Sequence, residues 1–545
     1  MNSHSRPSSS AISTTGDNIS PNINFVTPSA LPQPLPTLVE SPYLYRALGY
    51  HPIHPGDLLA DNRFLVLNKL GHGRNSTVWL CLDHKARRRP YKAVRVFHVR
   101  ASRLHHGDTV FFIWQKKDVL GISEKIAYEK LRLAVPIDQF HVYDREGQMN
   151  GGRGALVYPV LGPRVDDEGY LGYVAEKTGR SIWEVKKRVC YMVADALESM
   201  HGLGLCHADF RSENLLFEVK GLERLDVEEV KRVYGGQPKA YQHGLPLVVE
   251  EGDIKGIRPD YLIVKAGLNY RLLDEILAGK SVPRRRNTVD YDIYEDADEC
   301  IPKVFLIDMG ATWRFNELDP EPWYPLKEFY DKGIAPGGWC HRNFGQDRKE
   351  TLPRAYTAPE VWLGWQNPSP ESEVWALGCT IVKILLGKVP FGDQNESTEW
   401  DPKEKLTYER YDWEAASVQI EDDKGEMMKC WESFCGPLPK HYQARLKEDT
   451  PDRQDLIPSL DDDFGSGDSI EDGKVSERKV QGSGVQLGAG SCILEERTRK
   501  LGMPSRDGLQ LLDLLKGIFF WDPKKRLNVT QILDHPWFQI QNRRG

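Results

Sequence analysis

The feature that most constrains the fold of this chain is an ordered set of acidic and amide residues that follow apolar segments. His207-Ala-Asp-Phe-Arg-Ser-Glu-Asn214 comes after a helical pattern that starts at Ser181, in which apolar residues recur at three- and four-residue spacing. Phe305-Leu-Ile-Asp308-Met-Gly310 places an acid and a glycine directly after an apolar strand pattern. A single Asp after a strand is usually a cap or a turn residue, but three acidic and amide positions in this order are not a coincidence.

The two segments match motifs that carry phosphoryl-transfer chemistry. Asp209 and Asn214 stand five residues apart, as in H-R-D-L-x-x-x-N, and Asp308 stands as the acid does in D-F-G. One carboxylate must accept or orient the proton of the attacking hydroxyl, and a carboxylate with an amide oxygen must hold Mg²⁺ on the phosphates. We therefore predict Asp209, Arg211 and Asn214 as catalytic residues, and Asn214 and Asp308 as metal ligands.

The order of elements predicts an α+β protein with two lobes. Residues 64–97 contain three short strand patterns, and the pattern is helical from Ser181 onward. Strands followed by helices give separate β-rich and helical regions. We expect the small lobe over residues 60–160 and the large lobe over residues 161–540.

A glycine-bearing segment lies between the first two predicted strands. In Leu70-Gly-His-Gly-Arg-Asn-Ser-Thr-Val78, Gly71 and Gly73 would let backbone amides approach phosphate oxygens without a Cβ in the way. The third glycine of the common G-x-G-x-x-G-x-V loop is Ser76 here. An ordinary hairpin turn with glycines has the same pattern, so this segment alone does not decide between a turn and a phosphate-binding loop.

Further motifs make the chain resemble a eukaryotic protein kinase domain over about residues 60 to 540. These motifs occur in the kinase order: Ala358-Pro-Glu360, Glu373-Val-Trp-Ala-Leu-Gly378, Asp522-Pro-Lys-Lys-Arg526 and His535-Pro-Trp-Phe538. The resemblance implies a bilobal protein-kinase-like fold with a β-rich N-lobe and a large helical C-lobe. It also implies ATP and Mg²⁺ as cofactors, a Ser or Thr hydroxyl of a protein as the acceptor, and a phosphate-binding role for the loop from Leu70 to Val78.

Within that superfamily the chain most resembles the SR-protein kinases, particularly the fungal ones. The gap from Asp209 to Asp308 spans 99 residues, and that family carries a spacer at this point, here residues 217–300. The other matches are the leader before the first strand, the exit of the glycine loop and the hinge between the lobes: Gly49-Tyr-His-Pro-Ile53 with Gly56-Asp57, Ser76-Thr-Val-Trp-Leu80, and Leu156-Val-Tyr-Pro-Val-Leu-Gly-Pro163. The resemblance implies protein substrates that are rich in Arg and Ser.

The resemblance also assigns residues to the nucleotide. Pro159 would offer its carbonyl and Leu161 its N–H to adenine, and proline keeps the carbonyl although it lacks a donor. A buried strand end is compatible with the same residues. In Tyr91-Lys-Ala-Val-Arg-Val96 side chains alternate, so Ala93 would face adenine and Arg95, rather than Lys92, would face the phosphates. The expected partner of Arg95 is Glu124, with Glu129 a close second.

Four positions depart from the family pattern. Arg95 and Arg211 replace lysines, Glu373 replaces the aspartate that ties down the catalytic loop, and Ala208 replaces an arginine that many kinases, though not the SR-protein kinases, use to hold a phosphate. An Arg for Lys exchange is not conservative at a tight site.

These departures leave two functions open. We interpret the chain first as an active kinase, and the alternative is a catalytically weak or silent scaffold that binds Arg/Ser-rich proteins. A small-molecule phosphotransferase of the aminoglycoside-kinase type shares the H-x-D and N core but lacks A-P-E and the terminal helix.

Composition limits the remaining choices. The 545 residues carry a net charge of −7, which argues against nucleic-acid binding as the main task. Nine cysteines without a C-x-x-C pair fit reduced thiols in the cytoplasm or the nucleus. We expect no secretion signal and no membrane span, since Lys383 and Lys388 interrupt the most apolar window. We also expect a monomer.

Two segments have biased composition. Ser, Thr, Pro and Asn supply 22 of residues 1–40, which predicts a disordered tail because so little apolar area is available to offset the entropy of ordering. Eight acids between Pro451 and Lys474 predict a mobile acidic loop over residues 451–490. A more specific interpretation of the same charges is that they attract a basic partner electrostatically.

Overall fold

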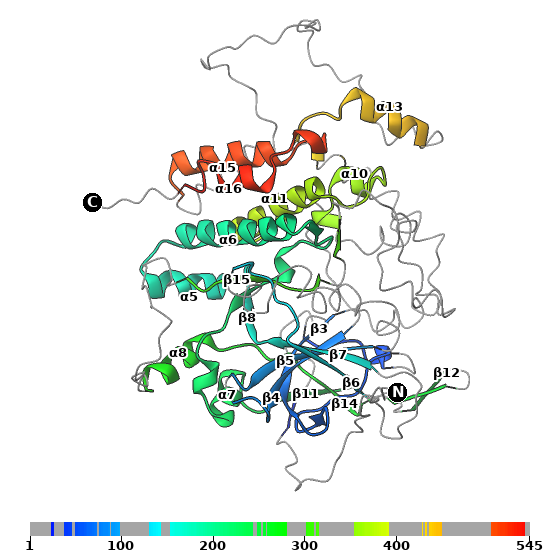
Figure 1. Ribbon diagram of the computed structural model, residues 1–545, viewed down its shortest axis with the longest axis vertical. Coiled ribbons are helices and arrows are strands. Elements are labelled where there is room, and N and C mark those ends of the chain that lie inside the picture. The colour runs from blue at the N-terminus through cyan, green and yellow to red at the C-terminus, as the bar shows by residue number, and fades with distance from the viewer. Residues whose placement is uncertain are drawn as a thin grey trace, which may run out of the picture.

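The computed structural model shows two lobes, one built on a sheet and one built from helices (Figure 1). It describes residues 23–26, 38–45, 49–73, 76–87, 89–98, 130–142, 153–243, 248–251, 254–257, 259–280, 301–309, 312–314, 354–391, 428, 431–432, 435–449 and 503–539. The predicted α+β architecture is confirmed. The acidic segment 451–490 lies outside the described residues.

The small lobe contains an antiparallel six-stranded sheet with the order β2-β3-β4-β5-β7-β6. Its strands are β2 (Leu58–Leu59), β3 (Phe64–His72), β4 (Ser76–Asp83), β5 (Tyr91–Phe97), β6 (Asp138–Val142) and β7 (Arg153–Pro159). Phe64, Trp79, Val94 and Val157 pack in one core on the sheet. The three strand patterns that the sequence showed between residues 64 and 97 therefore form neighbouring strands.

The large lobe is centred on two helices, α6 (Ile182–Gly202) and α11 (Pro370–Leu386). A capping box starts α6: the Ser181 side chain accepts from the Glu184 backbone, and the Glu184 side chain accepts from the Ser181 backbone. Trp375 of α11 is fully buried, because Phe391, Trp431 and Phe519 surround it. The remaining helices and 3₁₀ turns of this lobe are α5 (Glu168–Thr178), η4 (Ser212–Asn214), η8 (Arg354–Tyr356), α10 (Pro359–Trp362), α13 (Lys440–Asp449), α15 (Ser505–Ile518), η11 (Pro523–Lys525) and α16 (Val529–Leu533).

Short strands line the junction between the lobes. β8 (Leu161–Arg164), β10 (Leu215–Glu218) and β15 (Val304–Leu306) form one sheet, with β10 in the middle. β9 (Leu205–Cys206) pairs with β16 (Trp313–Arg314). Within the described residues no helix is long and apolar enough to cross a membrane.

The spacer packs mainly against the small lobe, although its position in the sequence placed it within the large one. It forms η5 (Leu222–Arg224), α7 (Val227–Val233), β11 (Lys239–Gln242), β12 (Val248–Glu251), β13 (Ile254–Ile257), β14 (Tyr261–Ile263) and α8 (Tyr270–Ala278). Val230 and Leu273 share a core with Leu80 and Tyr91 of the small lobe, and both helices lie beside that sheet (Figure 1). Tyr270 also contacts Tyr173 of α5, so the spacer touches both lobes.

The prediction of disorder over residues 1–40 is wrong for the described part of that segment. β1 (Asn24–Val26) pairs in parallel with β11, and η3 (Pro42–Leu44) follows it. Glu40 is buried and pairs with the buried Lys69 of β3, and the Tyr45 hydroxyl donates to the same carboxylate. Composition could not show this, because the pairing partners lie in the spacer and the small lobe.

Candidate active site

The loop between β9 and β10 holds the predicted catalytic residues close together. The Asn214 side-chain amide donates to the Asp209 carbonyl at 2.8 Å and to the Asp209 carboxylate at 2.9 Å. The Arg211 guanidinium lies 3.1 Å from the other carboxylate oxygen of Asp209. Burial raises the pKa of Asp209 above its usual range, and Arg211 and His207 oppose this rise. Asp209 is therefore a carboxylate with a fixed orientation and an adjacent positive charge.

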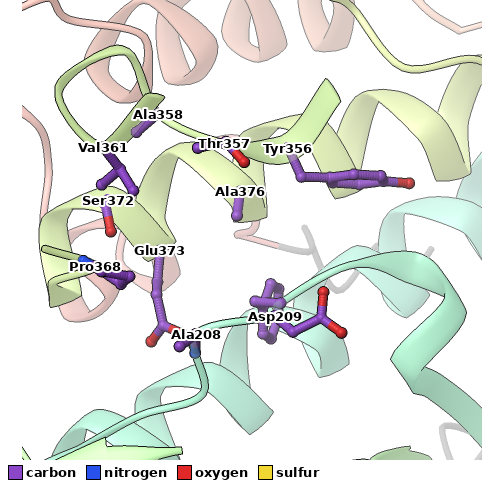
Figure 2. Close-up of a pocket in the computed structure, with 11 residues that line it drawn as sticks. Ala208, Asp209, Tyr356, Thr357, Ala358, Val361, Pro368, Ser372, Glu373 and Ala376 are labelled. Atoms are coloured by element: carbon purple, nitrogen blue, oxygen red, sulfur yellow. Dashed lines mark hydrogen bonds between the residues drawn. The ribbon is translucent and has the colours of Figure 1, made fainter. Parts of the chain in front are cut away.

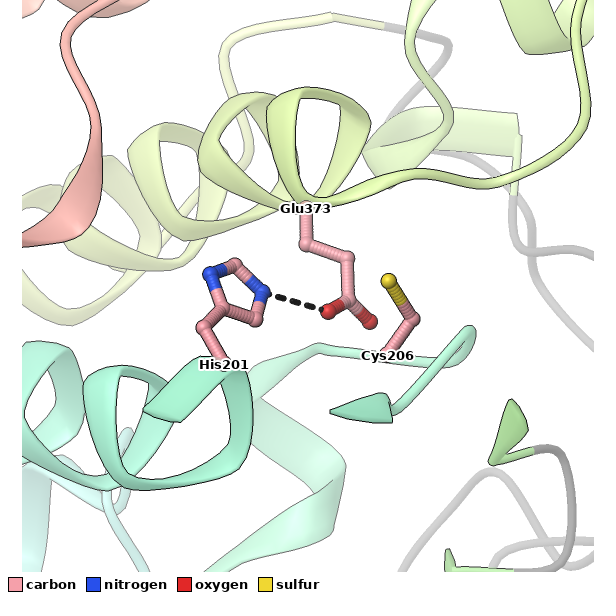
Figure 3. Close-up of side chains that lie close together, drawn as sticks. All are labelled: His201, Cys206 and Glu373. Atoms are coloured by element: carbon pink, nitrogen blue, oxygen red, sulfur yellow. Dashed lines mark hydrogen bonds and ion pairs between the residues drawn. The ribbon is translucent and has the colours of Figure 1, made fainter. Parts of the chain in front are cut away.

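Glu373 of α11 anchors the same loop. Its carboxylate accepts from the Ala208 backbone N–H at 2.6 Å. The same carboxylate contacts the His201 ring at 2.8 Å (Figure 3). Ala208 has a φ of 62°, an uncommon value for a residue with a side chain, and the Glu373 contact holds it there. The longer acid thus takes the tethering role that the resemblance gives to an aspartate, so this departure does not leave the loop untethered.

His201, Cys206 and Glu373 form a tight cluster whose ligand atoms all lie within 4.8 Å of one another. These residue types can bind a metal. Here both Glu373 oxygens already accept hydrogen bonds or contact His201, and burial raises the pKa of the Cys206 thiol far above its usual value. The cluster is accounted for as the tether of the catalytic loop.

Asp308 follows β15 and is brought next to the catalytic loop by strand pairing. Leu306 lies opposite Leu215, and the Ile307 N–H donates to the Asn214 carbonyl at 2.9 Å. Asp308 itself has a φ of 60°. Asn214 and Asp308 therefore sit at adjoining strand ends, and their amide and carboxylate oxygens are donors that suit a hard divalent cation.

Arg95 of β5 binds Asp308 with both ends of its guanidinium. The Nη1–Oδ1 distance is 2.7 Å and the Nη2–Oδ2 distance is 3.2 Å. The Arg95 Nε donates to the Ser76 hydroxyl at 2.7 Å. The strand register thus directs Arg95 toward Asp308, the predicted metal ligand. Strand alternation in the sequence had predicted that Arg95 faces the phosphates, which is the same side of the strand. Glu124 and Glu129, its expected partners, lie outside the described residues.

Two of the predicted nucleotide-contacting residues lie beside this pair: Ser76 accepts from Arg95, and Val78 lies opposite Arg95 on the neighbouring strand. Leu70, Gly71, Ser76 and Val78 belong to the β3–β4 hairpin, in which Gly71 lies opposite Val78, and the Gly73 N–H donates to the Ser76 carbonyl at 2.9 Å. The Tyr50 hydroxyl donates to the Gly73 carbonyl, a contact from the leader that the sequence did not predict.

The hinge residues are placed by the ends of two strands. Pro159 ends β7 and lies opposite Lys92, and Ala93 lies opposite Tyr158 one position along. Leu161 starts β8 and lies opposite Glu218 of β10. Pro159 and Leu161 thus lie where the chain leaves the small-lobe sheet for the junction sheet, and Ala93 lies on the strand next to β7.

A shallow pocket opens beside Asp209, between the catalytic loop and α10 and α11 (Figure 2). Tyr356, Thr357 and Ala358 form one wall, and Ser372 and Glu373 contribute to another. The A-P-E motif could have indicated part of this wall, but the sequence gave no sign that Tyr356 also contacts Ser212, at 3.1 Å, in the catalytic loop.

A buried ion pair fixes α10. Arg526 donates to both carboxylate oxygens of Glu360, at 2.6 and 2.7 Å, and to the Glu371 carbonyl at 3.0 Å. Its guanidinium lies over the Trp375 ring, 5.1 Å from the centroid. Both residues stood in quoted motifs, but their pairing joins segments 166 positions apart and was not predicted.

Comparison with known proteins matches residues 345–538 to the protein kinase domain family. Protein kinase dsk1 of Schizosaccharomyces pombe is 29% identical over 421 residues, which cover 71% of this chain and 72% of the relative. This chain is a relative of the protein kinases and is most like the SR-protein kinases.

Two further SR-protein kinase relatives match shorter stretches. Serine/threonine-protein kinase SKY1 of Saccharomyces cerevisiae is 27% identical over 33% of this chain and 23% of its own length. SRSF protein kinase 3 of Homo sapiens is 27% identical over 36% of this chain and 33% of its own length. A crystal structure of a kinase domain aligns with 90% of this chain and 99% of its own, at 15% identity and a TM-score of 0.43. The protein kinase family uses ATP and a divalent metal, and its acceptors are proteins.

Proposed function

We propose that this chain is an ATP-dependent serine/threonine protein kinase that uses Mg²⁺ and acts on Arg/Ser-rich proteins. The observation that carries the proposal is the convergence of Asp209, Asn214 and Asp308 at the junction of the lobes, beside an open pocket. Asp209 would orient the Ser or Thr hydroxyl, whose oxygen forms a bond to the γ-phosphorus while the bond from that phosphorus to the β–γ bridging oxygen breaks. The hydroxyl proton passes to Asp209.

The chain's own residues supply the remaining requirements. Arg211 places a positive charge beside Asp209, and Arg95 places another beside Asp308. Asn214 and Asp308 would hold the divalent cation, which neutralises phosphate charge when bound. Because Asn214 also orients Asp209, the metal ligand and the proton acceptor share one fixed framework.

The charge near the pocket favours basic substrates. Glu213 precedes Asn214 and is partly exposed, whereas the two acids that line the pocket, Asp209 and Glu373, already contact Arg211 and His201. Acidic groups around a site attract a positively charged segment. The similarity to the kinase whose name specifies SRSF proteins supports the same preference.

The full chain with labelled ATP and Mg²⁺ is expected to phosphorylate an Arg-Ser repeat peptide at least about tenfold faster than a Lys-Ser repeat, because arginine's forked guanidinium can bind a carboxylate with two hydrogen bonds and lysine cannot. An Arg-Ala repeat is the matched control without an acceptor. Incorporated label per minute is the measurement. Absence of transfer to every serine peptide would contradict the kinase proposal, and equal rates for the two serine peptides would contradict the Arg-Ser preference.

A scaffold that binds Arg/Ser-rich proteins without turnover is the second candidate. The observation that favours it is that Arg95 binds both carboxylate oxygens of Asp308, the residue predicted to hold the metal. A scaffold would bind the Arg-Ser peptide tightly and yet leave ATP unchanged, so peptide affinity measured beside ATP turnover separates the two functions.

Activity is expected to be independent of phosphorylation in residues 310–360. Ala208 stands where an arginine would be needed to hold such a phosphate, and the nearby Arg211 pairs with Asp209. Treatment with a phosphatase, followed by its removal, should leave the rate of peptide phosphorylation unchanged. A phosphatase-treated enzyme that loses its activity and regains it on rephosphorylation would contradict this expectation.

We further propose that the chain acts as a monomer in the cytoplasm or the nucleus and binds no nucleic acid. The cysteines whose placement is described are free, which fits a reducing compartment.

A further inference from the structure

Arg95 is held in place from several sides. Ser76 accepts from its Nε, Asp308 accepts from both Nη atoms, and the guanidinium carbon lies 4.9 Å from the centroid of the Phe97 ring. The Arg95 side chain is 15% exposed, and the Asp308 side chain is 33% exposed. The pair is thus ordered on the arginine side and open to solvent on the aspartate side.

The forked shape of arginine changes what Asp308 can offer to a cation. A lysine ammonium is a point charge on a flexible stem, so a lysine at this position would leave the second carboxylate oxygen accessible. The Arg95 guanidinium binds both oxygens and neutralises their charge at close range. A divalent cation that approaches Asp308 must therefore compete with a bidentate partner that Ser76 and Phe97 hold in position.

Arg95 can still donate a hydrogen bond to a phosphate oxygen while it is paired with Asp308. A guanidinium has five N–H donors, and Ser76 and Asp308 take three of them. This leaves a donor for a phosphate oxygen without release of Asp308.

We propose that Arg95 is the resident cation at Asp308, so that this chain binds ATP with little dependence on a divalent metal and needs the metal only for phosphate transfer. The inference rests on the proposed function, and it concerns nucleotide binding rather than turnover. It makes Arg95 a specificity-determining residue that sets the metal requirement of the site.

The test measures the affinity of the full chain for ATP by calorimetry, once in Mg²⁺ and once in EDTA. Chelation is expected to change the dissociation constant of the parent by less than about threefold, but to weaken ATP binding by Arg95→Lys at least about tenfold, because the ammonium frees Asp308 for the metal. Lys92→Arg is the matched control. Lys92 lies on the same strand, next to Ala93, but its side chain is on the opposite face of the sheet from Ala93 and Arg95, so this change should leave the parent's behaviour intact.

Different failures have different meanings. Parent protein that loses ATP affinity at least about tenfold on chelation would overturn the inference and leave the kinase proposal standing. Parent protein that binds no ATP in either condition would overturn both.

Asp308→Asn gives a second test that does not require Arg95→Lys to fold. In Mg²⁺ this variant should bind ATP within about threefold of the parent if Arg95 supplies the charge, whereas a loss of about tenfold or more would show that a metal held by Asp308 supplies it. Thermal unfolding of each variant establishes that the compared proteins are folded.

Discussion

Replacement of Asp209 by asparagine is expected to lower phosphate transfer at least about a hundredfold, the usual scale of a positioned acid or base. Asparagine keeps the shape of the side chain but cannot accept the hydroxyl proton. It also removes the negative charge from the contacts with Asn214 and Arg211. The measurement is the rate of label transfer from ATP to an Arg-Ser peptide at saturating substrate.

A matched control for this variant is Asp513→Asn on the surface of α15, where the acid is 77% exposed and contacts His535. That change should leave the rate within about twofold of the parent, since exposed ion pairs contribute little. ATP affinity should be similar in the parent and Asp209→Asn, because Asp209 acts on the acceptor hydroxyl. Transfer by Asp209→Asn at the rate of the parent would show that the kinase interpretation of this loop is wrong.

Arg526→Leu is expected to lower the free energy of unfolding by about 3–5 kcal/mol, because it leaves the buried Glu360 carboxylate without its partner. The Arg526 side chain is 0% exposed and the Glu360 side chain is 2% exposed, so water cannot replace the lost hydrogen bonds. Urea unfolding followed by tryptophan fluorescence measures the change, and Trp375, which lies beneath the Arg526 guanidinium, contributes to the signal.

Two comparisons sharpen the Arg526 result. Arg271→Leu breaks an exposed pair with Glu176 and should leave the free energy of unfolding almost unchanged, because solvent screens such pairs. The double variant Arg526→Leu with Glu360→Leu should recover much of the lost stability, because no unpaired charge remains. A single variant Arg526→Leu that is as stable as Arg271→Leu would contradict the role assigned to the buried pair.

The parts of the site that the sequence could predict are local in the chain. Asp209 and Asn214 are separated by one short loop, and strand alternation alone placed Ala93 and Arg95 on one face. The α6 helix was predictable because its apolar residues repeat at helical spacing over many turns. Such patterns arise within a single element, so they can be recognised without knowledge of its neighbours.

The contacts that the sequence could not predict join distant segments. Arg95 and Asp308 are 213 positions apart, and Ala208 and Glu373 are 165 positions apart. Nothing in the local pattern of either segment specifies its partner, because these pairs result from the packing of whole elements. The strand β1 lies in a polar segment and owes its existence to β11 in the spacer.

The buried pair of Glu40 and Lys69 limits how far the chain can be shortened without loss of stability. The strand patterns and kinase motifs begin near residue 60, and a fragment cut there would retain Lys69 while it lost its counter-ion. A fully enclosed ammonium without a partner must either lose its proton or draw water into the sheet. Residues 38–57 also carry Tyr50, which supports the glycine-rich turn through the Gly73 carbonyl. A fragment as stable as the full chain is therefore expected to include Glu40 and Tyr50.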